Sequence, residues 1–480
     1  MTQVNGRSGR QVSMETNIRR LIRSIFTARV WIALLLLGLV VGLSLTRQPA
    51  TALATAQPNV IFIVVDALRA DHVSAYGYER PTTPRLDAFM AGGLRFAEAT
   101  SPSSWTFPSN VTMFTGRMPQ RIRMNDWGSF NAVIPPEEMT LGQAMKNGGY
   151  LTAGFVTNYY LDSKFGFAQG FDHYQRLTET ELAEDLNGLI FDWLDTNPPA
   201  SDSRPLFLFA YYYDPHSWYD PPPPYDTLYK PGCPSALTPE SYGHGERVVA
   251  GEDVLTACDV EHLLALYDGE TTYWDYHLGL FLDRLEAEGL LDNALIVLTS
   301  DHGQMFGEHG KWVHRNSLYE EVLRVPLFIY YPGTAPAGMV VDTPVFTADI
   351  MPTILDLAGL PIPPKMDGKS LRPFLQGQPG TLLTRPIFAE MEAEPSLSSP
   401  GHWIAPPYSV RSIKVDGWKY VKEINNPAGD ALYQVQADSI YEGVNMRGDY
   451  PQKAQELHGT LFDWFRLPTD FLFFPSVRYR

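Results

Sequence analysis

Residues 59–66 read Asn-Val-Ile-Phe-Ile-Val-Val-Asp, a short apolar run that ends in an acid. Such a run, rich in β-branched side chains, is typical of a strand buried on both faces of a sheet. Similar runs recur at Leu151–Val156, Leu206–Tyr213, Ala294–Thr299 and Val325–Tyr330. Helical patterns separate them, at Thr140–Asn147, Glu179–Leu194 and Thr272–Glu288. The alternation predicts an α/β fold, in which a large, mostly parallel sheet lies between two layers of helices.

The pattern changes near residue 385. Short segments that alternate in the manner of antiparallel strands follow, at Tyr408–Val415, Trp418–Lys422 and Leu432–Val435, and a single helical pattern covers Pro451–Phe465. We therefore predict a main domain over residues 57–385 and a smaller C-terminal α+β subdomain over residues 386–480.

The first 56 residues have the composition of a targeting segment. Residues 1–29 contain six Arg and one acid, and they precede an uncharged apolar run from Val30 to Thr46. Ala-Thr-Ala follows at 54–56, so the parts of a secretory signal peptide are present. The apolar run also reaches the lower limit for a membrane-spanning helix, and a retained N-terminal membrane anchor is the other interpretation. Both predict that the rest of the chain lies outside the cytoplasm, as a periplasmic, secreted or membrane-anchored protein.

Composition limits the classes of partner. The chain is 44% hydrophobic and 19% charged, as globular proteins are, and its formal net charge of −17 argues against nucleic-acid binding. Cys233 and Cys258 either form a disulfide in an oxidising compartment or remain surface thiols, and we predict the disulfide. Both lie in a stretch from about Tyr225 to His262 that we expect to shape the substrate entrance. The sequence assigns no oligomeric state.

Polar residues follow several of the predicted strands. Asp66 follows the first, Thr157-Asn158 and Asp214-Pro215-His216 follow two others, and Asp301-His302 follow the run at 294–299. Because ligands bind beyond the carboxyl ends of the strands in open parallel sheets, we expect these side chains to meet in one site. Each acid taken alone is also a common helix cap or turn former. Together, Asp66, Asp301 and His302 form a plausible set of ligands for one metal ion.

A hydroxyl is predicted at the start of a helix near residue 106. In Trp105-Thr106-Phe107-Pro108-Ser109, the proline suits a first helical turn, and the residues after it continue a helix. The Thr106 hydroxyl then lies at the positive end of the helix dipole, where anions are favoured. It is either an N-cap or, beside a divalent cation, a nucleophile.

These residues resemble the motifs of the sulfatase family, within the alkaline phosphatase superfamily. The resemblance extends from about residue 58 to about 466 and includes a tail pattern at Leu432-Tyr433 … Asp438 … Glu442 … Asn445. The other matching motifs, in order, are Asp66 to His72, Thr106-x-Pro108-Ser109 to Gly116, Ser300-Asp301-His302-Gly303, Gly307-Glu308-His309-Gly310, Leu318-Tyr319-Glu320-Glu321, Arg324-Val325-Pro326, Asp349–Leu360 and Met366 to Leu371. The resemblance implies a sulfatase-like catalytic domain with an alkaline-phosphatase-like fold.

The resemblance also implies roles for single residues. Asp66, Asp301 and His302 correspond to ligands of one divalent metal ion (Ca, Mg, Mn or Zn), and Thr106 to the nucleophile, which also touches the metal. His216 corresponds to a histidine that contacts the ester and protonates the leaving oxygen; a loop-packing histidine is the other interpretation. For His72 and His309, in the motif loops, we expect structural hydrogen bonds.

Several positions depart from the family pattern. Sulfatases carry a Cys or Ser that becomes formylglycine where this chain has Thr106, and an Arg where it has Asn110. The second Asp of a family pair is Ala67 here. A family Lys and His fall at Thr157 and Tyr159.

A further family Lys, beyond the Asp-His motif, is replaced by His314. Cations that hold sulfate are thus largely missing. The metal, His216 and His314 remain as catalytic groups, with Asn110 and Asn158 as neutral donors to the substrate.

A Thr nucleophile is the pattern of the superfamily's phosphodiesterases and phosphoethanolamine transferases. Water can hydrolyse a phosphate ester of Thr, whereas Thr cannot expel sulfate as a formylglycine hydrate does. We therefore expect a metal-dependent hydrolase of sulfuric or phosphoric esters that prefers phosphodiesters, acting on a small-molecule, glycan or lipid ester. An envelope phosphoethanolamine-type transferase and a non-catalytic, sulfatase-like binding protein are the alternatives.

Overall fold

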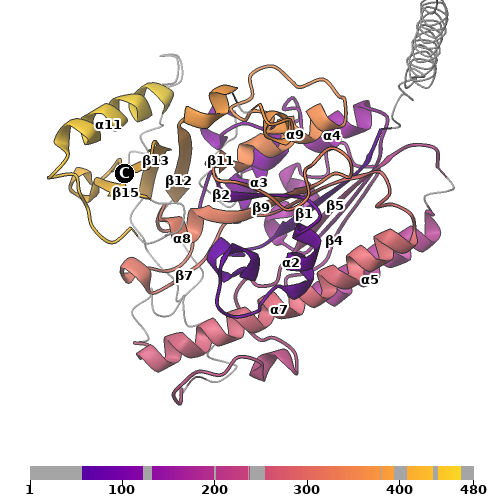
Figure 1. Cartoon of the computed structure of the whole chain (residues 1–480), viewed down its shortest axis with the longest axis horizontal. Helices are drawn as coiled ribbons and strands as arrows, with labels where there is room; N and C mark the ends of the chain where they lie inside the picture. Colours follow the sequence, from indigo (N-terminus) through magenta and orange to yellow (C-terminus); the bar gives the residue numbers. More distant parts are fainter. Residues whose placement is uncertain are drawn as a thin grey trace, which may run out of the picture. The chain divides into compact units, whose positions relative to one another are not determined.

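A nine-stranded sheet, in the order β10-β2-β9-β6-β1-β5-β3-β4 with β11 beside β2, forms the centre of the protein (Figure 1). This computed structural model describes residues 57–122, 132–198, 202–235, 237, 254–378, 380–393, 408–435 and 442–465, so the predicted leader lies outside it. The strands are β1 (Asn59–Val65), β2 (Leu94–Thr100), β3 (Leu151–Val156), β4 (His173–Arg176), β5 (Leu206–Tyr212), β6 (Ala294–Ser300), β9 (Arg324–Tyr330), β10 (Met339–Val341) and β11 (Val345–Phe346).

The sheet is mostly parallel, as predicted. Strand β1 lies between β5 and β6 and is parallel to both, with Val65 opposite Tyr212 on one side and Ser300 on the other. Strand β9 is antiparallel to its neighbours β6 and β2. Because β1 and β6 end at the same level, the residues that follow them emerge together at one edge of the sheet.

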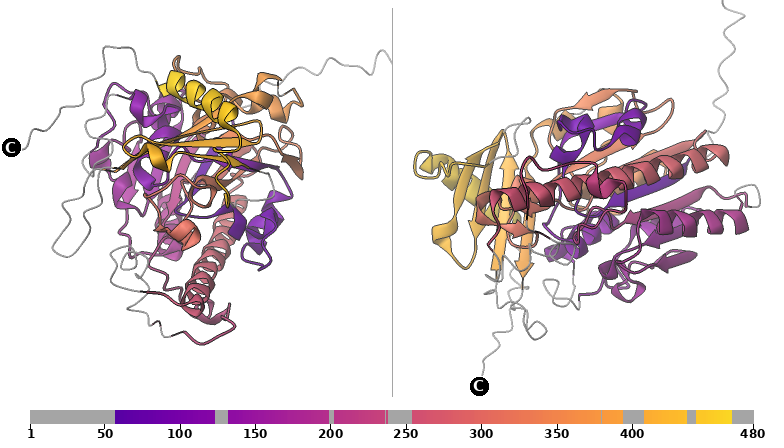
Figure 2. Two further views of the ribbon diagram at one scale, coloured as in Figure 1. Left: turned by 90° about the vertical axis from the view of Figure 1, so that its left-hand side faces the viewer. Right: turned by 90° about the horizontal axis from the view of Figure 1, so that it is seen from below.

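Helices cover both faces of the sheet because alternate side chains of the central strands point to opposite faces. Phe62 and Val64 of β1 pack in a core with one set of helices, and Ile61 and Ile63 in a core with the other. The first set is α3 (Thr106–Thr115), α4 (Leu141–Asn147) and α9 (Ile350–Leu357); the second is α2 (Pro84–Met90), α5 (Ala183–Thr196) and α7 (Ala257–Ala287). Figure 2 shows α7 and α5 running along the second face.

Helix α7 begins well before the predicted start at Thr272. Thr256 is its N-cap, accepting a hydrogen bond from the Asp259 amide in a capping box. Cys258, in the first turn, is disulfide-bonded to Cys233, with a Cα–Cα distance of 5.7 Å. The predicted disulfide is therefore present. Most of the stretch between the cysteines lies outside the described residues, and its role at the substrate entrance stays a prediction.

A second, antiparallel sheet follows, in the order β12 (Ile387–Ala393), β13 (Tyr408–Val415), β14 (Trp418–Glu423) and β15 (Ala431–Gln434). Helix α11 (Pro451–Phe465) packs against it through Leu457 and Leu461. Strand β13 and helix α11 have the predicted bounds, whereas β12 was not predicted. A domain boundary at residue 385 stays a prediction.

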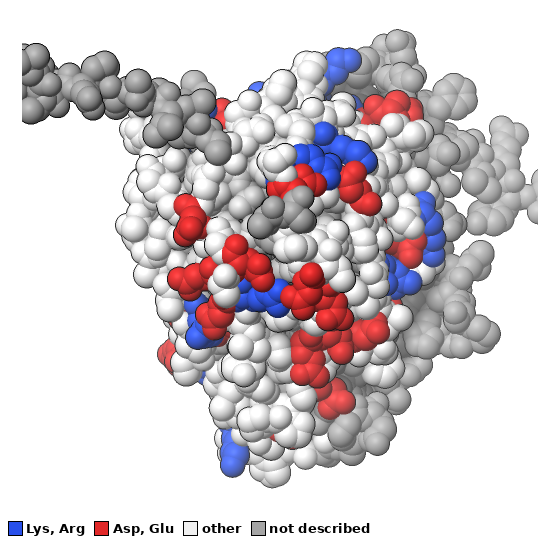
Figure 3. Space-filling view, turned by 90° about the vertical axis from the view of Figure 1, so that its right-hand side faces the viewer, with Lys and Arg blue, Asp and Glu red and all other residues white. Residues whose placement is uncertain are grey.

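Short elements complete the described chain, at β7 (Met305–Phe306), β8 (Trp312–Val313), α8 (Glu320–Leu323) and α10 (Arg372–Leu375). Among the described residues, no helix has both the length and the apolar character required to cross a bilayer. Acidic side chains are more numerous than basic ones on the face in Figure 3, in keeping with the net charge of −17.

Candidate active site

Two acids and a histidine meet where β1 and β6 end. Asp66 follows β1, and Asp301 and His302 follow β6; all three side chains are fully buried. One ligand-type atom from each lies within 4.8 Å of the others, which makes the three a candidate metal site. The register of the two parallel strands, with Val65 opposite Ser300, brings the acids together.

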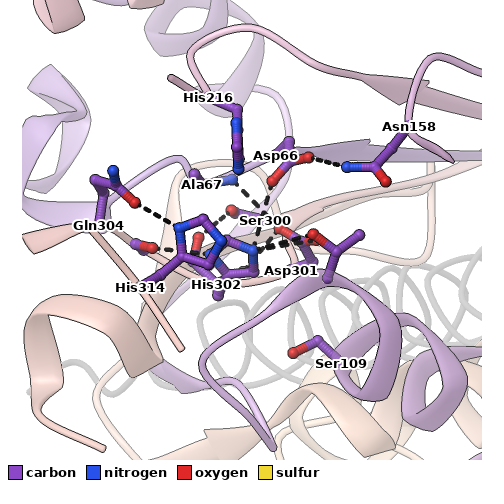
Figure 4. Close-up of polar contacts among 12 residues, drawn as sticks. Asp66, Ala67, Ser109, Asn158, His216, Ser300, Asp301, His302, Gln304 and His314 are labelled. Carbon is purple, nitrogen blue, oxygen red and sulfur yellow. Dashed lines mark hydrogen bonds and ion pairs between the residues drawn. The ribbon is translucent and has the colours of Figure 1, made fainter. Parts of the chain in front are cut away.

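Hydrogen bonding orients His302 as a ligand. Its Nδ1 lies 2.8 Å from the Gly303 carbonyl oxygen, so this nitrogen carries the hydrogen and donates it. The lone pair of Nε2 then points into the site, 3.3 Å from Thr106 Oγ1 and 3.5 Å from Asp66 Oδ1 (Figure 4). A second bond of this kind typically fixes the tautomer of a metal-bound histidine.

Neutral groups hold the two carboxylates. Asn158 Nδ2 donates to Asp66 Oδ2 at 2.7 Å, and Asn110 Nδ2 donates to Asp301 Oδ2 at 3.1 Å. The hydroxyl of Tyr211 donates to the same Asp301 oxygen at 2.7 Å, and burial followed by Asp301 and Asp66 raises the pKa of Tyr211 well above its usual value. The amide nitrogens of both asparagines are thus directed at the acids. Their predicted contact with substrate stays a prediction.

The electrostatics of this cluster favour a cation. Burial, and then the charge of Asp301, raises the pKa of Asp66 well above its usual value. Asp66 Oδ1 is buried and accepts no hydrogen bond, and within the described parts of the chain no Lys or Arg forms an ion pair with either acid. Buried charges require a partner charge, and hard oxygen ligands with an imidazole suit a divalent ion. The residues therefore fit one divalent metal.

Thr106 is the first residue of α3. The N-cap is Trp105, in extended conformation, and no side chain caps the helix. The Thr106 hydroxyl faces His302 instead of capping its own helix, so the N-cap interpretation does not hold. The side chain is buried at the positive end of a helix of 10 residues.

Two further histidines stand beside the cluster. The rings of His302 and His314 stack at 4.5 Å, and the ring of His216 lies 5.0 Å from that of His314 (Figure 4). His216 Nδ1 lies 2.8 Å from the Ser217 carbonyl oxygen and donates to it. The structure thus brings together the predicted residues Asp66, Thr106, His216, Asp301, His302 and His314, with Asn110 and Asn158 bound to the acids.

Hydrogen bonds also fix the ring of His314. Gln304 Nε2 donates to the Tyr219 hydroxyl at 2.8 Å, which leaves Gln304 Oε1 to accept from His314 Nδ1, also at 2.8 Å. Burial, followed by the charges of His302, His216 and Arg315, lowers the pKa of His314 well below its usual value. His314 is therefore a neutral imidazole near neutral pH.

Non-glycine residues in left-handed backbone conformation surround the site. Ala67, directly after Asp66, has φ 56°, and Val313 and Arg315, on either side of His314, have φ 57° and 65°. Such conformations are unfavourable for residues with a Cβ, above all a β-branched one, and they concentrate at functional sites. The sequence analysis identified Ala67 and His314 but missed Arg315, whose one signal was its position next to His314.

The two motif-loop histidines have structural partners. His72 Nδ1 lies 2.7 Å from Asp268 Oδ1. His309 Nε2 lies 3.0 Å from Glu321 Oε1, and the His309 ring stacks on Tyr319 at 3.8 Å. Both form the structural hydrogen bonds expected of them.

Known proteins resemble this chain both in sequence and in fold. The profile of the family described as Sulfatase matches residues 58–360. The chain belongs to the sulfatase family. A second profile, the C-terminal region of N-sulphoglucosamine sulphohydrolase, matches residues 307–461 of this sulfatase-family chain.

Similar sulfatases and similar structures span most of the chain. An arylsulfatase of Clostridium perfringens is 27% identical over 389 residues, covering 68% of this chain and 80% of the relative. A choline-sulfatase of Rhizobium meliloti is 27% identical, covering 81% and 82%. The structure of a phosphonate monoester hydrolase from Silicibacter pomeroyi shares the fold, with a TM-score of 0.69, 24% identity, and coverage of 85% of this chain and 95% of that one. This chain is thus a sulfatase-family ester hydrolase with an alkaline-phosphatase-like fold.

Proposed function

We propose that this sulfatase-family hydrolase cleaves phosphoric esters, with a preference for diesters, and that Thr106 is its nucleophile. The observation that carries the proposal is the place of the Thr106 hydroxyl, 3.3 Å from His302 Nε2 and at the positive end of α3. A hydroxyl there is oriented toward a reacting centre bound by the Asp66–Asp301–His302 cluster.

A divalent metal held by Asp66, Asp301 and His302, with Thr106 beside it, would supply positive charge that favours the ionised hydroxyl. The Thr106 oxygen attacks phosphorus and forms an O–P bond as the bond to the leaving alcohol breaks. Protonated His216 gives that alcohol the proton of Nε2 and keeps the proton of Nδ1, which is bound to the Ser217 carbonyl oxygen. Water then returns a proton to Nε2 of His216 and attacks phosphorus as the bond to Thr106 breaks, which restores the ionised Thr106 oxygen and the protonated His216.

The polar groups at the family's cation positions support the diester preference. Asn110 donates to Asp301 and to the Thr106 carbonyl oxygen, and the Thr157 hydroxyl donates to the Tyr211 carbonyl oxygen at 3.0 Å. Because His314 is neutral, these positions add no positive charge to that of the metal for binding a dianion. A phosphodiester carries one negative charge, so its binding needs less positive charge than that of a dianion.

Sulfate-ester hydrolysis is the second candidate, because the curated relatives above are named as sulfatases. Another relative is named an ulvan-active sulfatase, so the substrate proposed here is a small-molecule, glycan or lipid ester. An envelope phosphoethanolamine-type transferase would use the same threonine. In a non-catalytic binding protein, the Asp66–Asp301–His302 cluster would have a role other than catalysis.

The test uses purified full-length protein with Ca²⁺, Mg²⁺, Mn²⁺ or Zn²⁺ and three substrates: an aryl sulfate, an aryl phosphate monoester and an aryl phosphodiester. The expected result is diester turnover that falls by at least about 1,000-fold in Thr106→Ala, while metal binding and the melting temperature stay unchanged. Dominant sulfate turnover would show that the sulfatase reading is right. If none of the three substrates is turned over, the result would favour the transferase or the non-catalytic binding protein.

A series of leaving groups tests the role of His216 as the general acid. In His216→Ala, diesters with poor leaving groups should slow more than those with good ones, because the alcohol then leaves without a proton. Equal slowing across a series of aryl leaving groups would remove His216 as the acid.

An extracytoplasmic location is part of the proposal. The basic and apolar N-terminal segment and the Cys233–Cys258 disulfide support it, since disulfides persist in oxidising compartments. Sequencing the N-terminus of the mature protein in membrane and soluble fractions distinguishes the cleaved signal peptide from the retained anchor. A native N-terminus in the cytosolic fraction would contradict both.

A further inference from the structure

Helix α7 carries a buried glutamate, Glu270, that contacts the chain on both sides of His216. The segment concerned is residues 214–220, here called the His216 loop, which follows β5. Glu270 Oε1 accepts a hydrogen bond from the Asp220 backbone N–H at 2.9 Å. The Glu270 carboxyl group is also hydrogen-bonded to the side chain of Asp214, which is buried as well. One side chain of α7 therefore binds the loop at a point before His216 and at a point after it.

The backbone of α7 comes close to the chain that follows this loop. Gly269 directly precedes Glu270 within the helix, although glycine is unfavourable in a helix interior. A Cβ at this position would lie 2.5 Å from the Tyr225 carbonyl oxygen and 3.1 Å from Cγ of Pro221. The close approach thus depends on the missing side chain, and it keeps the next residue of the helix, Glu270, against the His216 loop.

The contact between the two carboxyl groups requires a proton. A carboxylate only accepts hydrogen bonds, so two carboxyl groups bind each other only when one of them is protonated. Burial, followed by the charge of Asp214, raises the pKa of Glu270 well above its usual value. Burial also raises the pKa of Asp214, to about 6, while hydrogen bonds from Glu270 and the Ala183 backbone act in the opposite direction. Glu270 is therefore the neutral member of the pair and donates to Asp214.

Hydrogen bonds within the His216 loop make its first part a compact unit. The His216 backbone N–H donates to the Tyr213 carbonyl oxygen at 2.8 Å. The Tyr213 hydroxyl donates at 3.1 Å to the Ser217 carbonyl oxygen, which also accepts from His216 Nδ1. The His216 ring lies 6.4 Å from that of His302 (Figure 4). Because the unit is held together internally, its place beside His302 depends on the contacts that hold the loop at its two ends.

We propose that Glu270 is a positioning residue for His216: by donating to Asp214 and accepting from the Asp220 N–H, it holds the loop so that His216 Nε2 faces the leaving group. This inference rests on the proposed function, in which His216 is the general acid. The neutral carboxyl of Glu270 acts only through the loop and does not touch the substrate. A glutamine has one C=O acceptor and one N–H donor in the same places, so it would satisfy both contacts.

The experiment compares wild type with Glu270→Met, Glu270→Gln, His216→Ala and the double variant Glu270→Met/His216→Ala, all with the metal that supports turnover. Substrates are methyl 4-nitrophenyl phosphate, whose leaving group needs little protonation, and methyl phenyl phosphate, whose leaving group needs more. In Glu270→Met, kcat on the phenyl ester should fall at least about tenfold more than kcat on the nitrophenyl ester, as in His216→Ala. The double variant should stay within about twofold of His216→Ala, because both changes remove the same contribution.

Glu270→Gln should recover most of this loss, and it fills the same space as the wild-type side chain. Asp275→Leu is the matched control, because Asp275 is a buried acid of α7 that accepts from the backbone N–H groups of Arg85 and Leu86 in α2. It removes a similar contact elsewhere on the helix and should slow both substrates equally. Equal slowing of both substrates in Glu270→Met, or a Glu270→Gln variant as impaired as Glu270→Met, would overturn the inference.

Hydrogen exchange distinguishes failure of this inference from failure of the proposed function. Amide exchange of the peptide that covers residues 214–220 is measured by mass spectrometry on the full-length variants without substrate. It should be at least about tenfold faster in Glu270→Met than in wild type, and unchanged in Glu270→Gln and Asp275→Leu. This result upholds the role of Glu270 in holding the loop even if no phosphodiester is turned over. Equal exchange in Glu270→Met and wild type overturns the inference, whatever the substrate.

Discussion

Two of the buried clusters of acids in the described part of the chain differ in how their charge is balanced. At the sheet edge, Asp66 and Asp301 have no Lys or Arg partner among the described residues. At the contact between the two sheets, Glu320 of α8 accepts from Lys414 at 2.9 Å and from Lys419 at 2.8 Å. Glu98 and Glu442 join this second cluster, through Lys414 at 3.3 Å and Lys419 at 3.2 Å.

The difference separates a structural cluster from a functional one. Burial by itself would raise the pKa of Glu320, but Lys414 and Lys419 outweigh it and hold that pKa below its usual value. At Asp66, burial and Asp301 act in the same direction and raise the pKa. Two lysines of the second cluster offset most of the charge of its three acids and join the C-terminal sheet to the main one, whereas the first cluster requires a cation from outside the chain.

The largest expected effect comes from removing one charge of the unbalanced pair. Asp66→Asn keeps an oxygen for the hydrogen bond from Asn158 and replaces the buried oxygen that accepts none. Turnover should fall by at least about 1,000-fold, because metal binding is lost. The metal-free protein should become more stable by about 1–3 kcal/mol near neutral pH, since one buried carboxylate is gone.

Calorimetric metal titration and urea unfolding, each with and without metal, measure both effects. Wild-type protein should gain stability on adding the metal, and Asp66→Asn should not. A variant that loses stability in the metal-free state would show that the acid pair has a structural role of its own.

The lysine-paired cluster around Glu320 should respond in the opposite way. Lys419→Met leaves buried carboxylates of Glu320 and Glu442 short of a cation, so the free energy of unfolding should fall by about 3–5 kcal/mol. The kcat of the protein that remains folded should not change. Lys453→Met is the control, because Lys453 pairs with Glu456 on the surface of α11 and should cost less than about 1 kcal/mol. If the free energy of unfolding falls equally in Lys419→Met and Lys453→Met, the buried cluster is no more important for stability than a surface ion pair.

A smaller effect is expected in the pH dependence of stability. Because the folded-state pKa of Glu320 is depressed, its contribution is present above the ordinary glutamate pKa and is lost as pH falls through the lowered value. Glu320→Gln should therefore flatten the acid limb of the stability curve by on the order of 2 kcal/mol. Urea unfolding of both proteins from pH 7 down to the acid transition gives the comparison, and parallel acid limbs would contradict the assignment.

The sequence predicted the central sheet and the residues at its edge because both depend on local patterns. Strands β1 and β6 are uninterrupted apolar runs, and Asp66 and Asp301 follow them directly. Strand β2 escaped prediction because its sequence, Leu-Arg-Phe-Ala-Glu-Ala-Thr, contains charges, one of which, Glu98, is buried against Lys414 far along the chain. An ion pair between residues so far apart in the sequence cannot be recognised from the residues around Glu98.

The first half of α7 was missed for a similar reason. Asp268, Gly269 and Glu270 lie in a row within this helix and are buried, a pattern that does not suggest a core helix. Asp268 is buried because His72, Tyr78 and Arg80 from another part of the chain bind it. Arg315 was likewise indistinguishable from a surface arginine until the fold placed it over Trp105.

The left-handed backbone at Ala67 has a consequence for how this site could change over generations. Asp and Asn enter that conformation more readily than alanine, so the chain at this position already has the shape that suits an acid. Two of the alanine codons become aspartate codons through one base change, and the other two become glutamate codons. An acid beside Asp66 is therefore one base change away from any alanine codon, and an aspartate there would suit the backbone already present.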